Sequence, residues 1–198
     1  MTIFTRLVDI DFSACDPSSS RGVMIWLISN APSLKAIHLT ESHFLPDVSN
    51  AMINMSHLSK LEITKIRGTA EFYDPITSFI RHHIAMEDQS TLEEFSLHIN
   101  DGITHAAAWL NLISQMNHLK DLKLLAGVFP EYFLPVLQKI GRGCPSLESL
   151  TLGNAYYRDA NFTDGVIRSL CEHPKLRYLK SSSQVIISRR LFRFVQVS

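Results

Sequence analysis

Apolar residues recur along this chain three positions apart and then two positions apart. The stretch CPSLESLTLGN, residues 144–154, shows the spacing with leucines at 147, 150 and 152. Neither a regular amphipathic helix nor a strictly alternating strand has this pattern. It occurs seven times in order: Leu7-Ile10-Phe12, Leu34-Ile37-Leu39, Leu58-Leu61-Ile63, Leu92-Phe95-Leu97, Leu119-Leu122-Leu124, Leu147-Leu150-Leu152 and a degraded Leu176-Leu179-Ser181.

The first leucines of successive copies follow one another at steps of 24 to 34 residues. All but one of these steps fall in the range of leucine-rich repeats, about 20 to 29 residues. The pattern therefore predicts an α/β leucine-rich repeat solenoid, a right-handed α-β superhelix of horseshoe shape with about seven repeats. Its parallel strands would line the concave face and its helices the convex face.

Within each unit, the second and third apolar residues belong to a short strand and point into the core, since side chains alternate along a strand. The first leucine packs under the preceding bend. The repeat therefore predicts that equivalent core residues lie beside one another in neighbouring parallel strands: Ile37, Leu61, Phe95, Leu122 and Leu150.

Segments with helical spacing of apolar residues separate the strands. They are GVMIWLISN (22–30), ITHAAAWLNLISQM (103–116), YFLPVLQKI (132–140) and TDGVIRSLCEH (163–173). Asp74-Pro75 and Thr163-Asp164 are expected to mark helix starts. Short phrases precede the strands, among them NAPSL, CPSL and HPKL, in which proline ends the helix and turns the chain.

The repeats divide the chain into a leucine-rich repeat domain over 1–181 and a C-terminal cap or remnant repeat over 182–198. A terminal unit needs such a cover for its core; a basic docking segment or the stub of a longer array is the alternative. An insertion over about 66–91 lengthens the third unit. It is interpreted as a longer crossover, with projection beside the concave surface as the alternative.

The repeats resemble those of F-box proteins, especially the cysteine-containing subclass. Leu7-Ile10-Phe12-Cys15 is similar to its strand motif, Phe162-Thr163-Asp164-Gly165-Val166 to its middle, and Cys144-Pro145-Ser146-Leu147 to its end. The resemblance implies substrate recognition or scaffolding linked to ubiquitin-dependent degradation. No L-P-x-E-I-L-like F-box segment is present, so a Skp-type adaptor is expected only if an F-box lies outside this chain.

Composition narrows the classes of partner. Lys and Arg total 19, as do Asp and Glu, so no overall charge favours nucleic acid or an anionic membrane. The longest apolar helical run, 23–28, is too short to cross a bilayer. Three scattered cysteines fit a reducing compartment, cytoplasmic or nuclear. A monomer that binds a protein partner on its concave face is the expectation.

The strand positions that point away from the core are the candidate contact residues, because concave solenoid surfaces ordinarily bind proteins. They mix both charges with hydroxyls and an aromatic ring, as recognition through polar pairs requires. The partner-binding candidates are Asp11, His38, Lys60, Glu62, Glu94, Ser96, His98, Asp121, Lys123, Thr151, Tyr178 and Lys180. The alternative for each is a residue that only keeps an exposed sheet face hydrated.

Catalytic chemistry has little support in the sequence, and we predict neither an enzyme nor a cofactor. The histidines His82, His83, His98 and His105 form no short metal-ligand set with the cysteines, and are interpreted as ordinary helix-surface residues. Cys15, Cys144 and Cys171 occupy repeat positions where a small apolar group packs. The leading hypothesis is a protein-interaction module; a structural scaffold or truncated repeat fragment without a ligase role is the alternative.

Overall fold

The structure, a computed structural model, describes residues 4–100, 107–126, 133–154, 170 and 173–181. Strands and helices alternate along them. The strands are β1 (Asp9–Asp11), β2 (Ala36–Thr40), β3 (Lys60–Ile66), β4 (Glu94–Ile99), β5 (Asp121–Ala126), β6 (Ser149–Asn154) and β7 (Tyr178–Ser181). The helices are α1 (Pro17–Asn30), α2 (Pro46–Ile53), α3 (Ala70–Ala85), α4 (Ala107–Ile113), α5 (Phe133–Gly143) and the 3-10 turns η1 (Glu41–His43) and η2 (Glu87–Gln89).

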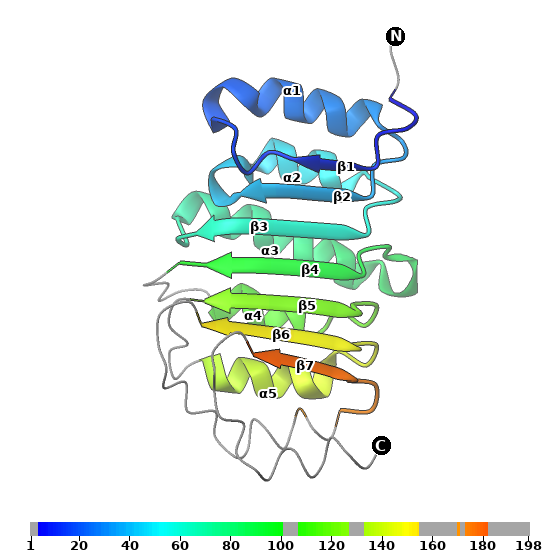
Figure 1. Cartoon of the computed structure of the whole chain (residues 1–198), viewed down its shortest axis with the longest axis vertical. Helices are drawn as coiled ribbons and strands as arrows, with labels where there is room; N and C mark the ends of the chain where they lie inside the picture. The colour runs from blue at the N-terminus through cyan, green and yellow to red at the C-terminus, as the bar shows by residue number, and fades with distance from the viewer. Residues whose placement is uncertain (1–3, 101–106, 127–132, 155–169, 171–172, 182–198) are drawn as a thin grey trace.

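All seven strands form one parallel sheet in the order β1-β2-β3-β4-β5-β6-β7, so each strand pairs with its neighbours in the chain. The helices lie on one side of this sheet, which does not close on itself (Figure 1). We call the side of the sheet that the described helices leave uncovered the open face. The predicted α/β architecture with alternating strands and helices is confirmed, and it is compatible with a solenoid.

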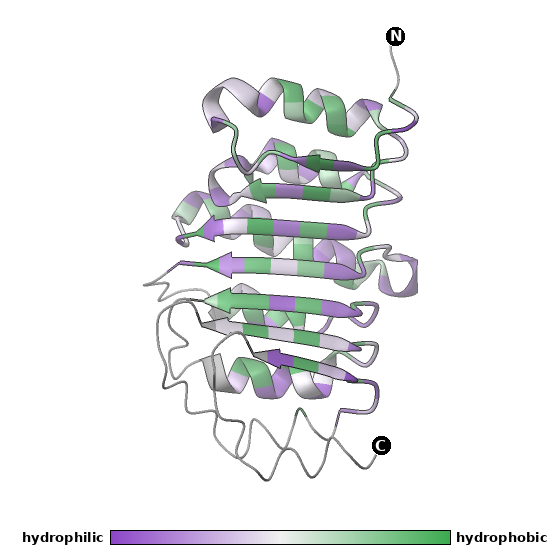
Figure 2. Ribbon diagram, in the orientation of Figure 1, coloured by the Kyte–Doolittle hydropathy of each residue, from purple (hydrophilic) through white to green (hydrophobic). Residues whose placement is uncertain are grey.

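The strand register brings equivalent repeat positions into straight rows across the sheet. Ile37 pairs with Leu61, Leu61 with Phe95, Phe95 with Leu122, and Leu122 with Leu150. Each of these five side chains is at most 1% exposed. The predicted neighbour relation is therefore confirmed, and the alternation of apolar and polar residues along the strands can be followed in Figure 2.

The corners before the strands also repeat. In each, a backbone N–H donates to a carbonyl of the preceding unit at 2.8 to 2.9 Å: Lys35 to Val8, Ser59 to Lys35, Glu93 to Ser59, Lys120 to Glu93, Glu148 to Lys120 and Arg177 to Glu148. The leucines that open the inner units, at positions 34, 58, 92, 119 and 147, are fully buried beneath these bends. The recurring phrases thus fold into equivalent corners.

Large aromatic side chains fill the space between the sheet and the helices. The ring of Phe44 contacts those of Phe72 and Phe79 edge-on, with centroids 5.6 and 5.7 Å apart. Phe72 contacts Trp109 in the same way at 6.0 Å. Edge-to-face pairs of this kind add to the stabilisation from apolar burial, and they connect the units of α2, α3 and α4 into one core.

The first three helices depart from the sequence prediction. Helix α3 begins at Ala70 after Thr69 and not at Asp74; Pro75 lies inside it, buried, and its carbonyl accepts a hydrogen bond from Ser49. Helix α2 was not predicted, because its eight residues are too few to display a helical period. Helix α1 starts earlier than the apolar segment indicates, since Asp16 caps its first turn through the N–H of Ser19.

The inserted third unit ends its strand in a bulge. The register between β3 and β4 shifts between Ile63 and Ile66, and Lys65 has a φ of 56°.

No helix in the described part of the chain has the length and apolar character needed to span a membrane. The predicted Thr163-Asp164 helix start and the cap over 182–198 lie outside the described residues.

Candidate partner-binding face

Two rows of polar side chains cross the open face, because residues paired in parallel strands point to the same side of a sheet. Positions are counted from the first leucine of each unit, for example Leu7. One row consists of the residues at the third position, which are Asp9, Ala36, Lys60, Glu94, Asp121, Ser149 and Tyr178. The other follows the fifth, from Asp11 through His38, Glu62, Ser96, Lys123 and Thr151 to Lys180. The structure therefore brings the predicted site residues onto one surface.

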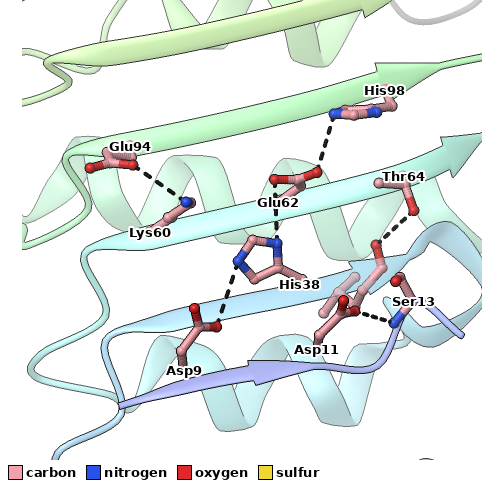
Figure 3. A network of polar contacts seen from close by, with 10 residues as sticks. Asp9, Asp11, Ser13, His38, Lys60, Glu62, Thr64, Glu94 and His98 are labelled. Atoms are coloured by element: carbon pink, nitrogen blue, oxygen red, sulfur yellow. Dashed lines mark hydrogen bonds and ion pairs between the residues drawn. The ribbon is translucent and has the colours of Figure 1, made fainter. Parts of the chain in front are cut away.

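Glu62 is the centre of the polar contacts on this face (Figure 3). One of its carboxylate oxygens lies 3.3 Å from Nδ1 of His38, and the other lies 3.2 Å from Nε2 of His98. The second ring nitrogen of His38 lies 3.6 Å from the carboxylate of Asp9. Four side chains from β1, β2, β3 and β4 thus form one chain of contacts across the sheet.

Further polar contacts lie beside this chain on the same strands. Lys60 lies 3.8 Å from Glu94 on the adjacent strand. Asp11 accepts a hydrogen bond of 2.7 Å from the backbone N–H of Ser13, and hydrogen bonding from Ser13 lowers the pKa of the Asp11 carboxyl. Thr64 donates to the carbonyl of Leu39 at 3.4 Å. Positions of these side chains are therefore held by contacts within the face.

His98 is only partly exposed, and this burial lowers its pKa. The neighbouring Glu62 acts in the opposite direction, and Lys123 adds to the lowering. Because desolvation outweighs the carboxylate, His98 is neutral at pH 7 and can both donate and accept a hydrogen bond. Such a ring can accept a hydrogen bond from a partner, and it loses this ability when it is protonated at low pH.

Ser96 corrects one sequence prediction. It lies on the open face between Glu62 and Lys123, yet its side chain is only 4% exposed. Its hydroxyl has no hydrogen-bond partner among the described residues. So small an exposed area makes Ser96 a poor contact residue for a partner.

The far end of the face is less acidic. Tyr178 on β7 is 60% exposed, and Lys180 on the same strand is exposed as well. Thr151, Lys123 and Asp121 are half-buried on β6 and β5. An exposed aromatic ring beside hydroxyl and ammonium groups is a common composition of protein interfaces.

The cysteine predictions are confirmed in one case and wrong in another. Cys144 is buried and its thiol donates to the carbonyl of Ile113; burial raises the pKa of this thiol to about 12, which opposes thiolate chemistry at neutral pH. Cys15 is exposed and does not pack in the core. Cys171 lies outside the described residues.

His83 was expected on the surface of a helix, but the structure places it in the interior. His83 of α3 is 2% exposed, and its Nδ1 lies 2.8 Å from the hydroxyl of Ser90. The same hydroxyl lies 2.8 Å from Nε2 of His118. Burial lowers the pKa of His83 to about 3. This His83–Ser90–His118 cluster depends on contacts 28 residues apart in the chain, which helical periodicity alone could not indicate.

No arrangement of three or more histidine, cysteine, aspartate or glutamate residues in the described part of the chain could hold a metal ion. No family model matches the sequence, and no curated protein matches it. The open face, with its polar rows, is the candidate functional surface of the described residues.

Proposed function

We propose that this chain is a protein-interaction module of the leucine-rich repeat type, similar to the repeat regions of F-box proteins, and that it binds a protein partner on its open face without catalysing a reaction. Equivalent units stacked in chain order and L-x-x-L-x-L spacing support the repeat assignment. Stacked units of this kind provide extended surfaces for binding.

The contact chain centred on Glu62 is the observation that carries the proposal. A carboxylate held between two imidazoles is positioned in advance, so that little side-chain freedom is lost when a partner binds. Asp9, Asp11 and Glu94 surround it with negative charge, whereas Lys180 and Tyr178 mark the other end. This distribution suits a partner whose charge changes along its length, because complementary charge determines orientation and association rate.

A capture experiment tests the open face. The variant combines Lys60→Glu, Glu62→Lys, Glu94→Lys and Lys123→Glu, which leaves the net charge unchanged. Its control carries the same exchange on exposed residues of the helix side, namely Asp74→Lys, Arg81→Glu, Asp88→Lys and Lys139→Glu. Proteins retained by the wild type and the control but lost by the open-face variant support the proposal. Identical capture by both variants contradicts it.

A role in ubiquitin-dependent degradation is the finer part of the proposal and rests on the sequence resemblance alone. A Skp-type adaptor among the captured proteins, lost only when the F-box-bearing component is removed, supports it. The alternative is a scaffold without a partner of its own. It is favoured if native mass spectrometry of the chain isolated under mild conditions shows no bound protein.

A further inference from the structure

A cleft lies away from the open face, at the edge where strands end and helices begin. It has a volume of about 710 Å³ and is formed by the carboxyl-terminal ends of β2 and β3 and the first turns of α1 and α3. Pro17 and Leu45 are partly exposed in its wall, and Phe44 and Phe72 lie buried beneath them. Its apolar part is therefore built from the same side chains that connect the core.

One buried carboxylate fixes the backbone along this cleft. Glu41, 6% exposed, accepts hydrogen bonds from the backbone N–H of Arg67, from that of Gly68 at 3.2 Å and from that of Thr69 at 2.6 Å. The hydroxyl of Thr69 donates to it as well, at 2.8 Å. With so many donors its charge is largely compensated. The loop between β3 and α3 is consequently ordered before any ligand arrives.

The end of β3 and this loop present two cationic side chains without counterions, Lys65 on the strand and Arg67 on the loop. Lys65 and Arg67 are exposed at the cleft, and neither forms an ion pair with any residue that the structure describes. By contrast, Arg21 across the cleft is 2.8 Å from Asp47. Among the described residues, the cleft thus has one paired cation in its wall and two unpaired ones, on the end of β3 and on the loop that Glu41 fixes.

Lys65 occupies a backbone conformation that lysine rarely adopts. Its φ of 56° falls in the left-handed region, at the register shift between Ile63 and Ile66 in the pairing of β3 with β4. Glycine or asparagine is favoured there, and other residues cost free energy. Backbone strain of this kind concentrates at binding sites, where the side chain or the chain direction is needed. The bulge lies at the end of β3, next to the cleft that Lys65 and Arg67 both line.

From these observations we propose that the cleft binds an extended segment of a partner protein in which an acidic side chain adjoins an aliphatic one. The carboxylate lies between Lys65 and Arg67, and the aliphatic chain lies against Leu45 and Pro17. Glu71, in the first turn of α3, disfavours a second negative charge nearby. A peptide with one well-placed carboxylate suits the cleft better than a polyanion such as nucleic acid.

Peptide binding to the intact chain tests this site independently of the open face. The probe is a fluorescein-labelled peptide with a single aspartate next to a leucine among otherwise uncharged residues, and the reference peptide has asparagine in place of that aspartate. Fluorescence anisotropy at low ionic strength measures both affinities. We expect the acidic peptide to bind, and the Lys65→Glu/Arg67→Glu variant to bind it about tenfold more weakly or worse. The charge-matched control, Lys35→Glu/Lys139→Glu, keeps the wild-type affinity.

A second variant separates a binding defect from a folding defect. Lys65→Asn suits the left-handed backbone and is expected to raise Tm by about 1 to 3 °C while lowering the peptide affinity severalfold. Three results would overturn the proposal: equal affinity for the aspartate and asparagine peptides, equal losses in the cleft and control variants, or tighter binding of a single-stranded oligonucleotide that the cleft variant abolishes. None of these readouts depends on the open-face partner.

Discussion

The carbonyl oxygen of Ser114 lies 2.2 Å from the position that a β-carbon on Gly143 would occupy. Gly143 is the last residue of α5, and Ser114 directly follows α4, so the two helical units touch through their backbones. A methyl group at this position must push them apart. We expect Gly143→Ala to lower the free energy of unfolding by about 2 to 3 kcal/mol, measured by urea denaturation.

Gly22 provides the matched control for this substitution. It lies in α1, exposed, with no heavy atom within 4 Å of the point that the methyl group of an alanine would occupy. Alanine is the better helix former, so Gly22→Ala should raise the free energy of unfolding by about 0.5 to 1 kcal/mol. Equal effects of the two substitutions would show that α4 and α5 are not in backbone contact.

Adjacent residues on β5 should respond very differently to the same new charge. Leu122 is fully buried, whereas Lys123 is half-exposed on the open face. Leu122→Asp places a carboxylate in the stacked core, and we expect a loss above about 4 kcal/mol, or complete unfolding by circular dichroism. Lys123→Asp should change stability by less than about 1 kcal/mol. Similar losses from both would contradict the assignment of faces.

The buried His83 predicts that the protein is less stable in acid. Its pKa is lowered from the ordinary 6.5 to about 3, chiefly by burial and further by the charges of His82 and His118. Between these pH values the unfolded state binds more protons, so this contribution is complete above about pH 6.5 and is lost as pH falls toward 3. One such group gives a slope of about 1.4 kcal/mol per pH unit.

Urea denaturation at several pH values measures that slope. His83→Asn keeps a polar atom near Ser90 but cannot be protonated, so it should be less stable than the wild type at pH 7.5 and should depend less on pH below 6.5. Burial lowers the pKa values of His43 and His118 too, and their slopes remain. An unchanged slope in the variant would contradict a neutral, buried His83.

Glu41 should order the start of α3. Removing its carboxylate in Glu41→Ala leaves the N–H groups of Arg67, Gly68 and Thr69 without their acceptor, and we expect a loss of about 2 to 4 kcal/mol. Hydrogen exchange of these three amides should accelerate more than that of the β5 amides. The control Glu71→Ala, exposed in the same region, should leave the exchange of all three amides unchanged.

Residues whose environment is set within their own unit were predicted well from the sequence. The rows of strand residues follow from the L-x-x-L-x-L spacing, because successive side chains of a strand point to opposite faces of the sheet, one buried and one exposed. Helix α3 was misplaced because Asp74-Pro75 resembles a helix start, whereas the true start depends on Glu41, which lies 28 residues before Thr69. The spacing of residues along the sequence cannot indicate a hydrogen-bond acceptor that lies so far away in the chain.

The candidate site shows the same division. The open-face positions were predicted from register, and Glu62, His38 and His98 do meet there. Ser96 was predicted as exposed from its position in the strand, but it is only 4% exposed, so strand position alone does not determine the exposure of a small side chain. Lys65 and Arg67 were missed because the cleft that they line forms beside a bulge with a positive φ, and neither feature gives a periodic signal in the sequence. The combination Lys-Ile-Arg-Gly at the end of the strand was the available hint.

Each inner strand that the structure describes is hydrogen-bonded to the strand directly before it and the strand directly after it in the chain. The number of repeat units in this architecture can therefore change without altering the rest of the fold. Duplication of the gene segment that encodes one inner unit would widen the sheet by one strand spacing, about 4.8 Å, and leave all other strand pairings intact. A binding surface of this kind can be enlarged or shortened in small steps during evolution, without the redesign that a closed barrel would demand.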